Sequence, residues 1–231
     1  MENLETKQSN RATKVVASTL GVLVGLAGID HGFFEILQGN VAPSGVMIEA
    51  IGPAQRFWEY GTETALTIIP NFLVSGILSI IVGVVVIIWA RLFVQKKYAA
   101  GILMLLSIVL FLVGGGFAPI FMAILASLTA SRINKPLKLW RALLPTVVRG
   151  FLAKIWLGVL ITFVIIFSIS VEIAIFGSPL TSFFDAATTF NLLNTVAYIM
   201  LGFMLLSVLT GFAHDIHTVE NNSEKREYQH G

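Results

Sequence analysis

Residues 98–131 read YAAGILMLLSIVLFLVGGGFAPIFMAILASLTAS, a run of 34 residues without a single Asp, Glu, Lys or Arg. As one helix this run would measure about 51 Å, which is too long to cross about 30 Å of hydrocarbon once. Three glycines and a proline stand at its centre, in the sequence GGGFAP at 114–119, and such residues interrupt helices. The pattern predicts a helical hairpin made of two short segments, 98–113 and 117–131.

Basic residues flank this run on both sides. Segment 91–97 holds Arg91, Lys96 and Lys97, and segment 132–154 holds six more Lys or Arg residues. Basic residues in short loops stay on the cytoplasmic side of a membrane. Both ends of the run therefore belong on the same side, as a hairpin requires, and the glycine-rich tip is expected on the outer side.

Charged residues are scarce in the whole chain. Of its 231 residues, 12% are charged and 56% are hydrophobic, whereas soluble domains carry about a quarter charged residues. This composition excludes a soluble enzyme, a coiled coil and a basic nucleic-acid-binding protein, so we expect no nucleic-acid partner. The absence of cysteine excludes disulfides and cysteine-ligated metal centres. The sequence predicts an all-α, polytopic helical bundle embedded in a lipid bilayer.

Further apolar segments are long enough to cross a bilayer, at about 15–37, 66–90, 155–175 and 188–213. Together with the hairpin they predict about six membrane-embedded segments in one transmembrane domain, 15–213. The tails 1–14 and 214–231 are both expected in the cytoplasm, and the second is expected to be disordered. A cleaved signal peptide is an alternative for the first segment. Short loops and the lack of cysteine favour a prokaryotic cytoplasmic membrane.

Small residues recur at steps of three and four along one face of the first predicted span. The stripe consists of Ser18, Gly21, Gly25, Gly28 and Gly32. A neighbouring helix can pack closely against such a face. At 100° per residue Glu35 lies in the middle of the stripe, His31 lies at its edge, and Asp30 lies on the opposite face. His31 and Glu35 are one helical turn apart and can touch.

Polar side chains are concentrated in the outer half of the predicted bundle. Ionisable residues inside a span are energetically expensive, which makes them candidates for a functional site. The predicted ligand-binding residues are His31, Glu35, Asn71, Glu172, Asn191 and Asn194. We expect them to share one cavity that is open to the outside and closed below by apolar helices. The alternative is that these groups only hold the helices together through interhelical hydrogen bonds.

Two loops between the spans are unusually apolar. Segment 38–63 carries Phe57, Trp58 and Tyr60, and aromatic residues of this kind favour the membrane interface. We expect it to lie on the outer surface or to cap the bundle. Segment 135–150 mixes basic and apolar residues around Trp140, which is typical of an interfacial helix on anionic lipid.

Three classes of function fit these features. The cavity binds or transports a small solute or cation, for which carboxylates and amides are suitable ligands. Alternatively, the chain is an accessory subunit whose glycine stripe docks a membrane protein partner or a second copy. A membrane-embedded enzyme is the third class, but the chain has no HExxH, GxSxG or paired-Asp motif. No motif indicates a particular cofactor or metal.

Overall fold

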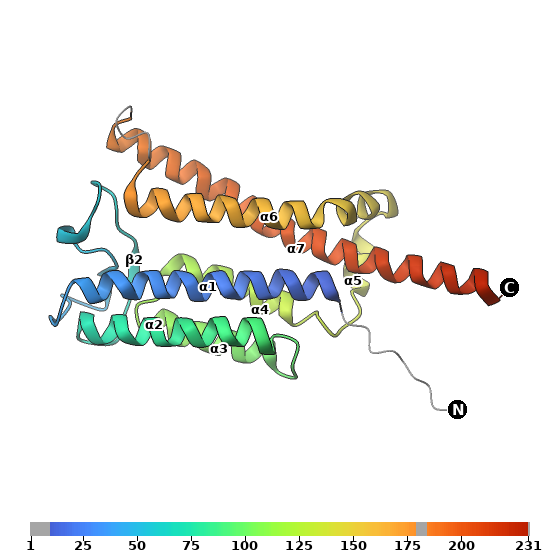
Figure 1. The fold of residues 1–231 in the computed structure, drawn as a ribbon, viewed down its shortest axis with the longest axis horizontal. Helices are drawn as coiled ribbons and strands as arrows, with labels where there is room; N and C mark the ends of the chain where they lie inside the picture. The colour runs from blue at the N-terminus through green and yellow to red at the C-terminus, as the bar shows by residue number, and fades with distance from the viewer. Residues whose placement is uncertain (1–9, 179–183, 231) are drawn as a thin grey trace.

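The computed structural model describes residues 10–178 and 184–230, with side chains described up to residue 223. Its helices, shown in Figure 1, are α1 (Arg11–Leu37), α2 (Phe72–Ile88), α3 (Ala99–Leu112), α4 (Phe117–Ala130), α5 (Lys138–Leu143), α6 (Thr146–Phe176) and α7 (Ala186–His230). A π-helical turn, η2 (Trp89–Phe93), extends α2, and a short 3-10 turn, η1 (Pro53–Gln55), lies in the loop after α1. Two short strands, β1 (Met47–Glu49) and β2 (Thr64–Leu66), pair antiparallel. The predicted all-α class is confirmed.

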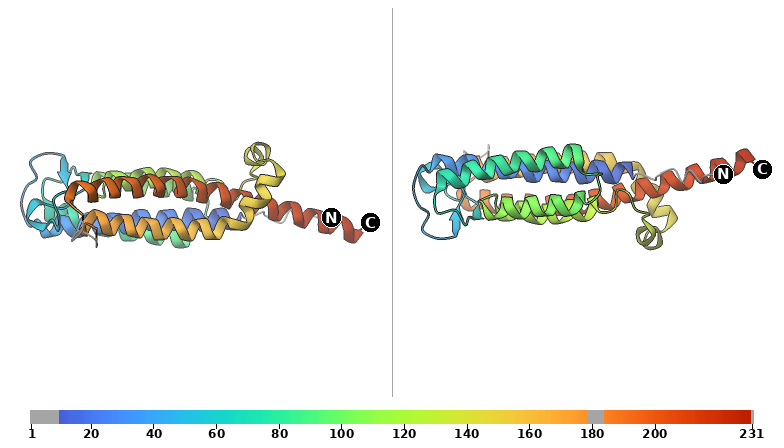
Figure 2. Two further views of the ribbon diagram at one scale, coloured as in Figure 1. Left: turned by 90° about the horizontal axis from the view of Figure 1, so that it is seen from above. Right: turned by 90° about the horizontal axis from the view of Figure 1, so that it is seen from below.

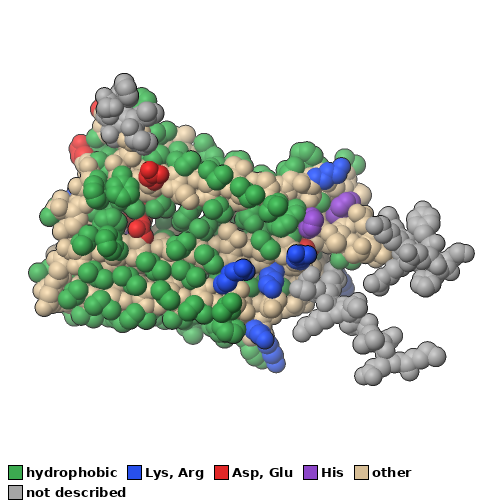
Figure 3. Space-filling model, in the orientation of Figure 1, with side chains coloured by type: hydrophobic (Ala, Val, Ile, Leu, Met, Phe, Trp, Pro, Cys, Tyr) green, Lys and Arg blue, Asp and Glu red, His purple; other side chains and the backbone are tan. Residues whose placement is uncertain are grey.

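Four helices are long and apolar enough to cross a membrane: α1, α2 together with η2, α6, and α7 as far as Ser223. Apolar side chains cover the visible surface between the two ends of the bundle (Figure 3). A water-soluble protein rarely exposes so continuous an apolar surface, whereas a lipid-embedded bundle requires it. Helices α3 and α4 have 14 residues each and are too short to be counted with the four. The expected total of six embedded segments therefore stays a prediction.

The predicted hairpin is confirmed by the way α3 and α4 pack against each other. Its tip contains Gly114 with φ +103° and Gly116 with φ +84°, values that glycine adopts without steric cost. The Gly114 N–H donates a hydrogen bond of 2.9 Å to the Leu66 carbonyl, which fixes the tip against β2. We call the end of the bundle that contains this tip the cavity end, because the cavity described below lies near it. The opposite end, where residues 94–98 and 131–137 turn, is the basic end.

The glycine stripe of α1 is a close packing face, as predicted, and α2 covers much of it. A Cβ atom added at Gly25 would lie 2.5 Å from the carbonyl oxygen of Gly83, and one added at Gly83 would lie 2.7 Å from that of Gly25. Gly32 and Gly76 oppose each other in the same way. The two helix backbones therefore approach each other more closely than any larger residue would allow.

Helix α1 is the centre of the bundle, because α2, α4 and α7 all pack against it. Figures 1 and 2 show α6 and α7 as a pair that lies beside the group formed by α1, α2, α3 and α4. Fully or nearly fully buried apolar side chains join these parts, among them Leu20, Val24, Leu103, Phe163 and Phe212.

Helices α2 and α6 begin furthest from the predicted residues. Helix α2 begins at Phe72 instead of 66, because residues 64–66 pair as a strand and the Asn71 side chain caps the helix by accepting a hydrogen bond from the Val74 N–H at 3.1 Å. Helix α6 begins at Thr146 instead of 155, so the expected interfacial segment 135–150 comprises α5 and the first turn of α6. Its binding to anionic lipid stays a prediction.

The chain after residue 213 differs from the expected disordered tail, because α7 continues as a helix to His230. Polar contacts with the rest of the bundle explain part of this difference. Asp215 is buried and accepts hydrogen bonds from the backbone N–H groups of Ala12 at 2.9 Å and Thr13 at 2.7 Å. A carboxylate at this place satisfies the free N–H groups at the start of α1 and interacts favourably with the helix dipole.

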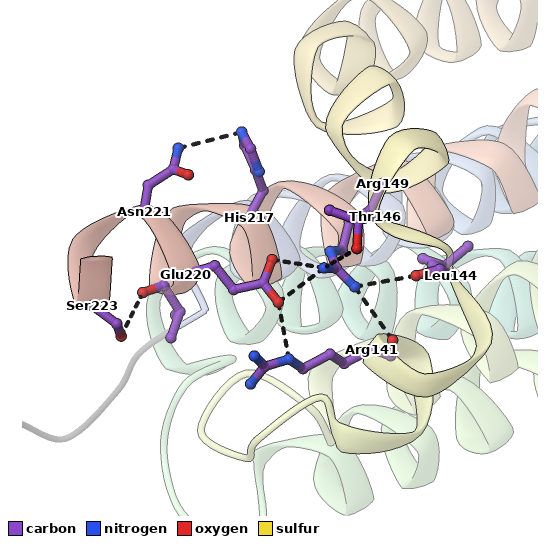
Figure 4. Close-up of polar contacts among 9 residues, drawn as sticks. Arg141, Leu144, Thr146, Arg149, His217, Glu220, Asn221 and Ser223 are labelled. Atoms are coloured by element: carbon purple, nitrogen blue, oxygen red, sulfur yellow. Dashed lines mark hydrogen bonds and ion pairs between the residues drawn. The ribbon is translucent and has the colours of Figure 1, made fainter. Parts of the chain in front are cut away.

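A second polar contact, drawn in Figure 4, joins α7 to the start of α6. The Glu220 carboxylate lies 2.8 Å from the guanidinium of Arg149 and 2.9 Å from that of Arg141. Arg149 is buried and also donates to the carbonyl oxygens of Leu144 at 3.1 Å and Arg141 at 3.3 Å. The predicted segment began after Lys154 because charged residues set its boundary, whereas α6 itself contains both Lys154 and the buried, ion-paired Arg149.

Candidate functional site

A cavity of about 520 Å³ lies between the α1–α4 part of the bundle and the α6–α7 pair. This volume falls within the range of small-molecule sites, about 300–1,000 Å³. Figure 3 shows a hollow between the two parts, with acidic side chains beside it. Its polar lining residues are Asp30, His31, Thr62, Glu63, Ser170 and Asn194.

The remaining lining is mostly apolar and extends toward the middle of the bundle. Phe163 of α6 and Met204 of α7 line this deeper part, and they lie nearer the basic end than the polar lining residues of the same helices, Ser170 and Asn194. Met122 of α4 also lines it. Below it, packed apolar residues such as Val16 and Leu20 fill the space between the helices. The cavity thus has one polar end and one apolar end.

His31 and Glu63 form the best-defined polar contact of the cavity. The His31 Nε2 atom lies 2.8 Å from the Glu63 Oε2 atom. The His31 side chain is 7% exposed, whereas that of Glu63 is 42% exposed. The histidine is therefore held inside the bundle, and the glutamate connects it to the surface of the cavity end.

The loop after α1 places Glu63 over the helix bundle. The backbone N–H of Ala50 donates to the Glu63 carbonyl at 2.8 Å, and the Thr62 hydroxyl donates to the Ile51 carbonyl at 2.9 Å. These bonds continue the β1–β2 pairing toward the cavity. The predicted capping role of segment 38–63 is supported by Trp58, whose indole N–H donates to the Ala174 carbonyl of α6 at 3.1 Å.

Carboxylates dominate the charge at the polar end. Asp30 is half-buried and lines the cavity next to His31 on α1. None of the described residues that line the cavity is a lysine or an arginine. Asp30 and Glu63 therefore face the cavity, and among the described lining residues His31 is the one that can carry a positive charge. This charge balance favours a ligand that is cationic or donates hydrogen bonds.

The structure brings two of the six predicted ligand-binding residues into this cavity, His31 and Asn194. Both face the space between α1 and the α6–α7 pair. Asn194 lies on the same face of α7 as the lining residue Ala197, one turn later. A ligand-binding role for these two residues stays a prediction.

The expectation that all six residues share one cavity is wrong, because four of them do not line it. Glu35 is fully buried on the side of α1 that faces the hairpin tip. Asn71 caps α2 and donates to the Asn40 side chain at 2.6 Å. Glu172 and Asn191 are exposed on α6 and α7, because the helical turn carries them away from the lining faces of those helices.

Glu63 is the polar-end residue that the sequence analysis missed. It lies 32 positions after His31, in a loop whose path no periodic pattern encodes. The available signal was chemical: Glu49, Glu59 and Glu63 make the loop acidic, opposite a span that contains a histidine. Asp30 was noted on the opposite face from the glycine stripe, and that face is the one that borders the cavity.

The contact between Glu63 and His31 predicts that the attachment of loop residues 50–63 to the bundle depends on pH. Burial raises the pKa of Glu63, but the hydrogen bond and the charge of His31 outweigh burial and hold the pKa below its usual value of 4.5. A group whose pKa is lowered by folding stabilises the fold above its unfolded-state pKa, and this contribution is lost as the pH falls through the folded-state pKa. We therefore expect the loop to loosen when the pH falls below 4.5.

Amide hydrogen exchange of residues 50–63, corrected for the intrinsic pH dependence, measures this effect. Glu63→Gln should show at neutral pH the faster exchange that the unmodified protein shows only in acid. Glu59→Gln is the matched control, because Glu59 is an exposed carboxylate of the same loop. Equal exchange in Glu63→Gln and the unmodified protein at neutral pH would contradict the prediction.

Among the described residues there is no cluster of three or more His, Asp or Glu side chains arranged to hold a metal ion. The arrangement can instead bind a small molecule by charge and hydrogen bonding at one end and by apolar contact along the rest. Comparison of the chain with protein-family models, with curated proteins and with solved structures finds no match.

Proposed function

We propose that this chain is an integral membrane protein that binds a small amphiphilic amine in the cavity between α1, α4, α6 and α7. The observation that carries the proposal is the division of the cavity into two chemically different ends. Asp30 and Glu63 provide carboxylates for a cationic headgroup, with no lysine or arginine among the described lining residues. Phe163, Met200 and Met204 provide an apolar surface for the rest of the molecule.

The route into the cavity is a lateral one in this proposal. Phe121 of α4 and Leu201 of α7 both line the cavity and are also exposed on the outside of the bundle, at 64% and 46%. Helix α4 packs mainly on α1 and α3, so the gap between α4 and α7 faces the lipid. An amphiphile dissolved in the bilayer can enter there with its headgroup toward the cavity end.

The orientation that we propose places the cavity end outside and the basic end in the cytoplasm. In Figure 3 the visible lysines and arginines gather toward the end from which α7 extends. Arg91, Lys96 and Lys97 precede α3 at that end, and Arg132 and Lys135 follow α4. This distribution is the one that the positive-inside rule associates with cytoplasmic loops. Both termini then lie inside.

Binding is supported better than transport through the bundle. Among the described residues, those that line the deeper part of the cavity are apolar, and packed apolar residues such as Val16 and Leu20 lie below them. The accessory-subunit alternative loses the surface on which it depended, because α2 and α3 of the same chain already cover the glycine stripe of α1.

A binding titration with three amphiphiles that differ only in their headgroup tests the proposal. Purified protein in nanodiscs is titrated with a long-chain primary amine, and with the alcohol and the carboxylic acid of the same chain length. Tryptophan fluorescence gives the signal, since Trp58 is bonded to the cavity-lining residue Ala174. We expect saturable binding of the amine and weaker binding of the other two.

Asp30→Asn and Glu63→Gln should each weaken amine binding by about tenfold or more, as expected for loss of one charge-assisted hydrogen bond. Glu172→Gln is the matched control, because it neutralises an exposed carboxylate outside the cavity. Equal affinity for amine and alcohol, or an equal loss in Glu172→Gln, would disprove the proposed headgroup site.

A further inference from the structure

The carboxyl group of Glu35 is enclosed at the hairpin tip, on the side of α1 away from the cavity. Its side chain is fully buried. The backbone of Gly114 lies directly against it, so that a Cβ atom added at position 114 would overlap the carboxyl oxygens. Among the described residues, neither oxygen of Glu35 has a hydrogen-bond partner. This group is therefore cut off from water and from hydrogen-bond donors alike.

The Ser75 hydroxyl and the Gly114 N–H, which lie near Glu35, take part in other hydrogen bonds. The Ser75 hydroxyl lies beside the carboxyl group of Glu35, but it donates its hydrogen to the Val113 carbonyl at 3.0 Å. When Ser75 donates to Val113, the Thr67 hydroxyl is the donor in the 2.7 Å contact between the two hydroxyls, because Ser75 has a single hydrogen. The Gly114 N–H donates to Leu66.

The charges around Glu35 do not compensate a carboxylate either. Helices α2, α3 and α4 and strand β2 contain no charged side chain. The titratable groups of α1 near Glu35 are His31, one turn earlier, and Asp30, whereas Arg11 and Lys14 lie at the opposite end of the helix. The loop contributes Glu63 through its bond to His31. Val113 ends α3 and Phe117 begins α4 at the same tip, so the two helix dipoles oppose each other there and supply no counter-ion. An ionised, unpaired carboxylate here is very costly.

We propose that Glu35 is a proton-binding site whose carboxyl group is neutral in the folded bundle. The proton reaches the site from the cavity end through Glu63 and His31, since His31 Nε2 is bonded to Glu63 and its Nδ1 is buried without a partner among the described residues. Glu35 is within reach of His31 as its neighbour one helical turn later.

The same geometry disfavours a sodium ion as the occupant. The Thr67 and Ser75 hydroxyl oxygens are 2.7 Å apart, which is the separation of two oxygens that share a hydrogen. Oxygens that ligate one cation are instead spread around it. The protonation of Glu35 itself does not depend on what binds in the neighbouring cavity.

Infrared difference spectroscopy of the purified protein tests this site directly. A neutral carboxylic acid has a carbonyl stretch that a carboxylate lacks, and the band shifts in D₂O. We expect such a band at neutral pH in the unmodified protein, its loss in Glu35→Gln, and its retention in the control Glu172→Gln. Ser75→Ala keeps the carboxyl group of Glu35 but removes a hydroxyl beside it, so it should shift the band, which covers the case that Glu35→Gln does not fold.

His31→Gln tests the route, because it should slow the exchange of the band into D₂O. The proposal is overturned if no neutral-acid band at neutral pH depends on Glu35. It is also overturned if sodium at constant pH abolishes the band, because the site would then bind a metal ion in place of the proton.

Discussion

Replacing Gly25 by leucine is expected to prevent stable folding of the bundle, with a loss of at least about 3 kcal/mol. Even a single added carbon at this position would lie 2.5 Å from the carbonyl oxygen of Gly83 and 2.6 Å from the side chain of Ile87. The carbonyl belongs to the backbone of α2 and cannot rotate away. The two helices would have to separate along their length, and the packing of Gly32 against Gly76 would be lost with it.

Gly158→Leu is the matched control for this change. Gly158 lies within α6 and has no atom within 4 Å of an added Cβ, so leucine there is accommodated and gains up to about 1 kcal/mol of helix propensity. The measurement is the yield of monodisperse protein in detergent together with its thermal unfolding midpoint. If the two leucine variants behaved alike, α1 and α2 would not be in backbone contact.

The glycine contacts show how far the sequence predicts this fold. The spacing of Gly21, Gly25, Gly28 and Gly32 identified the packing face of α1 from helical geometry alone. The partner was not identified, although Gly76 and Gly83 are seven residues apart on α2, as Gly25 and Gly32 are on α1. A periodic pattern describes one helix, whereas contact between two helices depends on the loop that joins them.

The candidate site was less predictable for the same reason. Charge-free runs and the GGGFAP break describe helices, and helices were predicted well. His31 meets Glu63 only because the loop after α1 folds back through the β1–β2 pair. Glu172 was misassigned because a carboxylate near the end of a span can face lipid headgroups or water at low cost. Depth in the membrane follows from the sequence, but the direction of a side chain requires knowledge of the neighbouring helices.

Replacing Glu220 by glutamine is expected to destabilise the protein by about 3–5 kcal/mol, because it leaves the buried charge of Arg149 without its counterion. Arg149 is 5% exposed, and its other contacts are to carbonyl oxygens and one hydroxyl, which do not neutralise it. Arg141→Ala removes the other partner of Glu220 (Figure 4). The Arg141 side chain is 62% exposed, so this control should cost no more than about 1 kcal/mol.

The double variant Arg149→Met with Glu220→Gln separates the loss of a charge pair from the loss of packing. Thermal unfolding in one detergent should show much of the stability restored, since removal of both members of a buried ion pair is often close to neutral. Three outcomes would contradict the prediction: equal midpoints for Glu220→Gln and Arg141→Ala, no loss in either, or a double variant no more stable than Glu220→Gln. Recovery in the double variant would show that Glu220 holds α7 against α6 because Arg149 is charged and buried there.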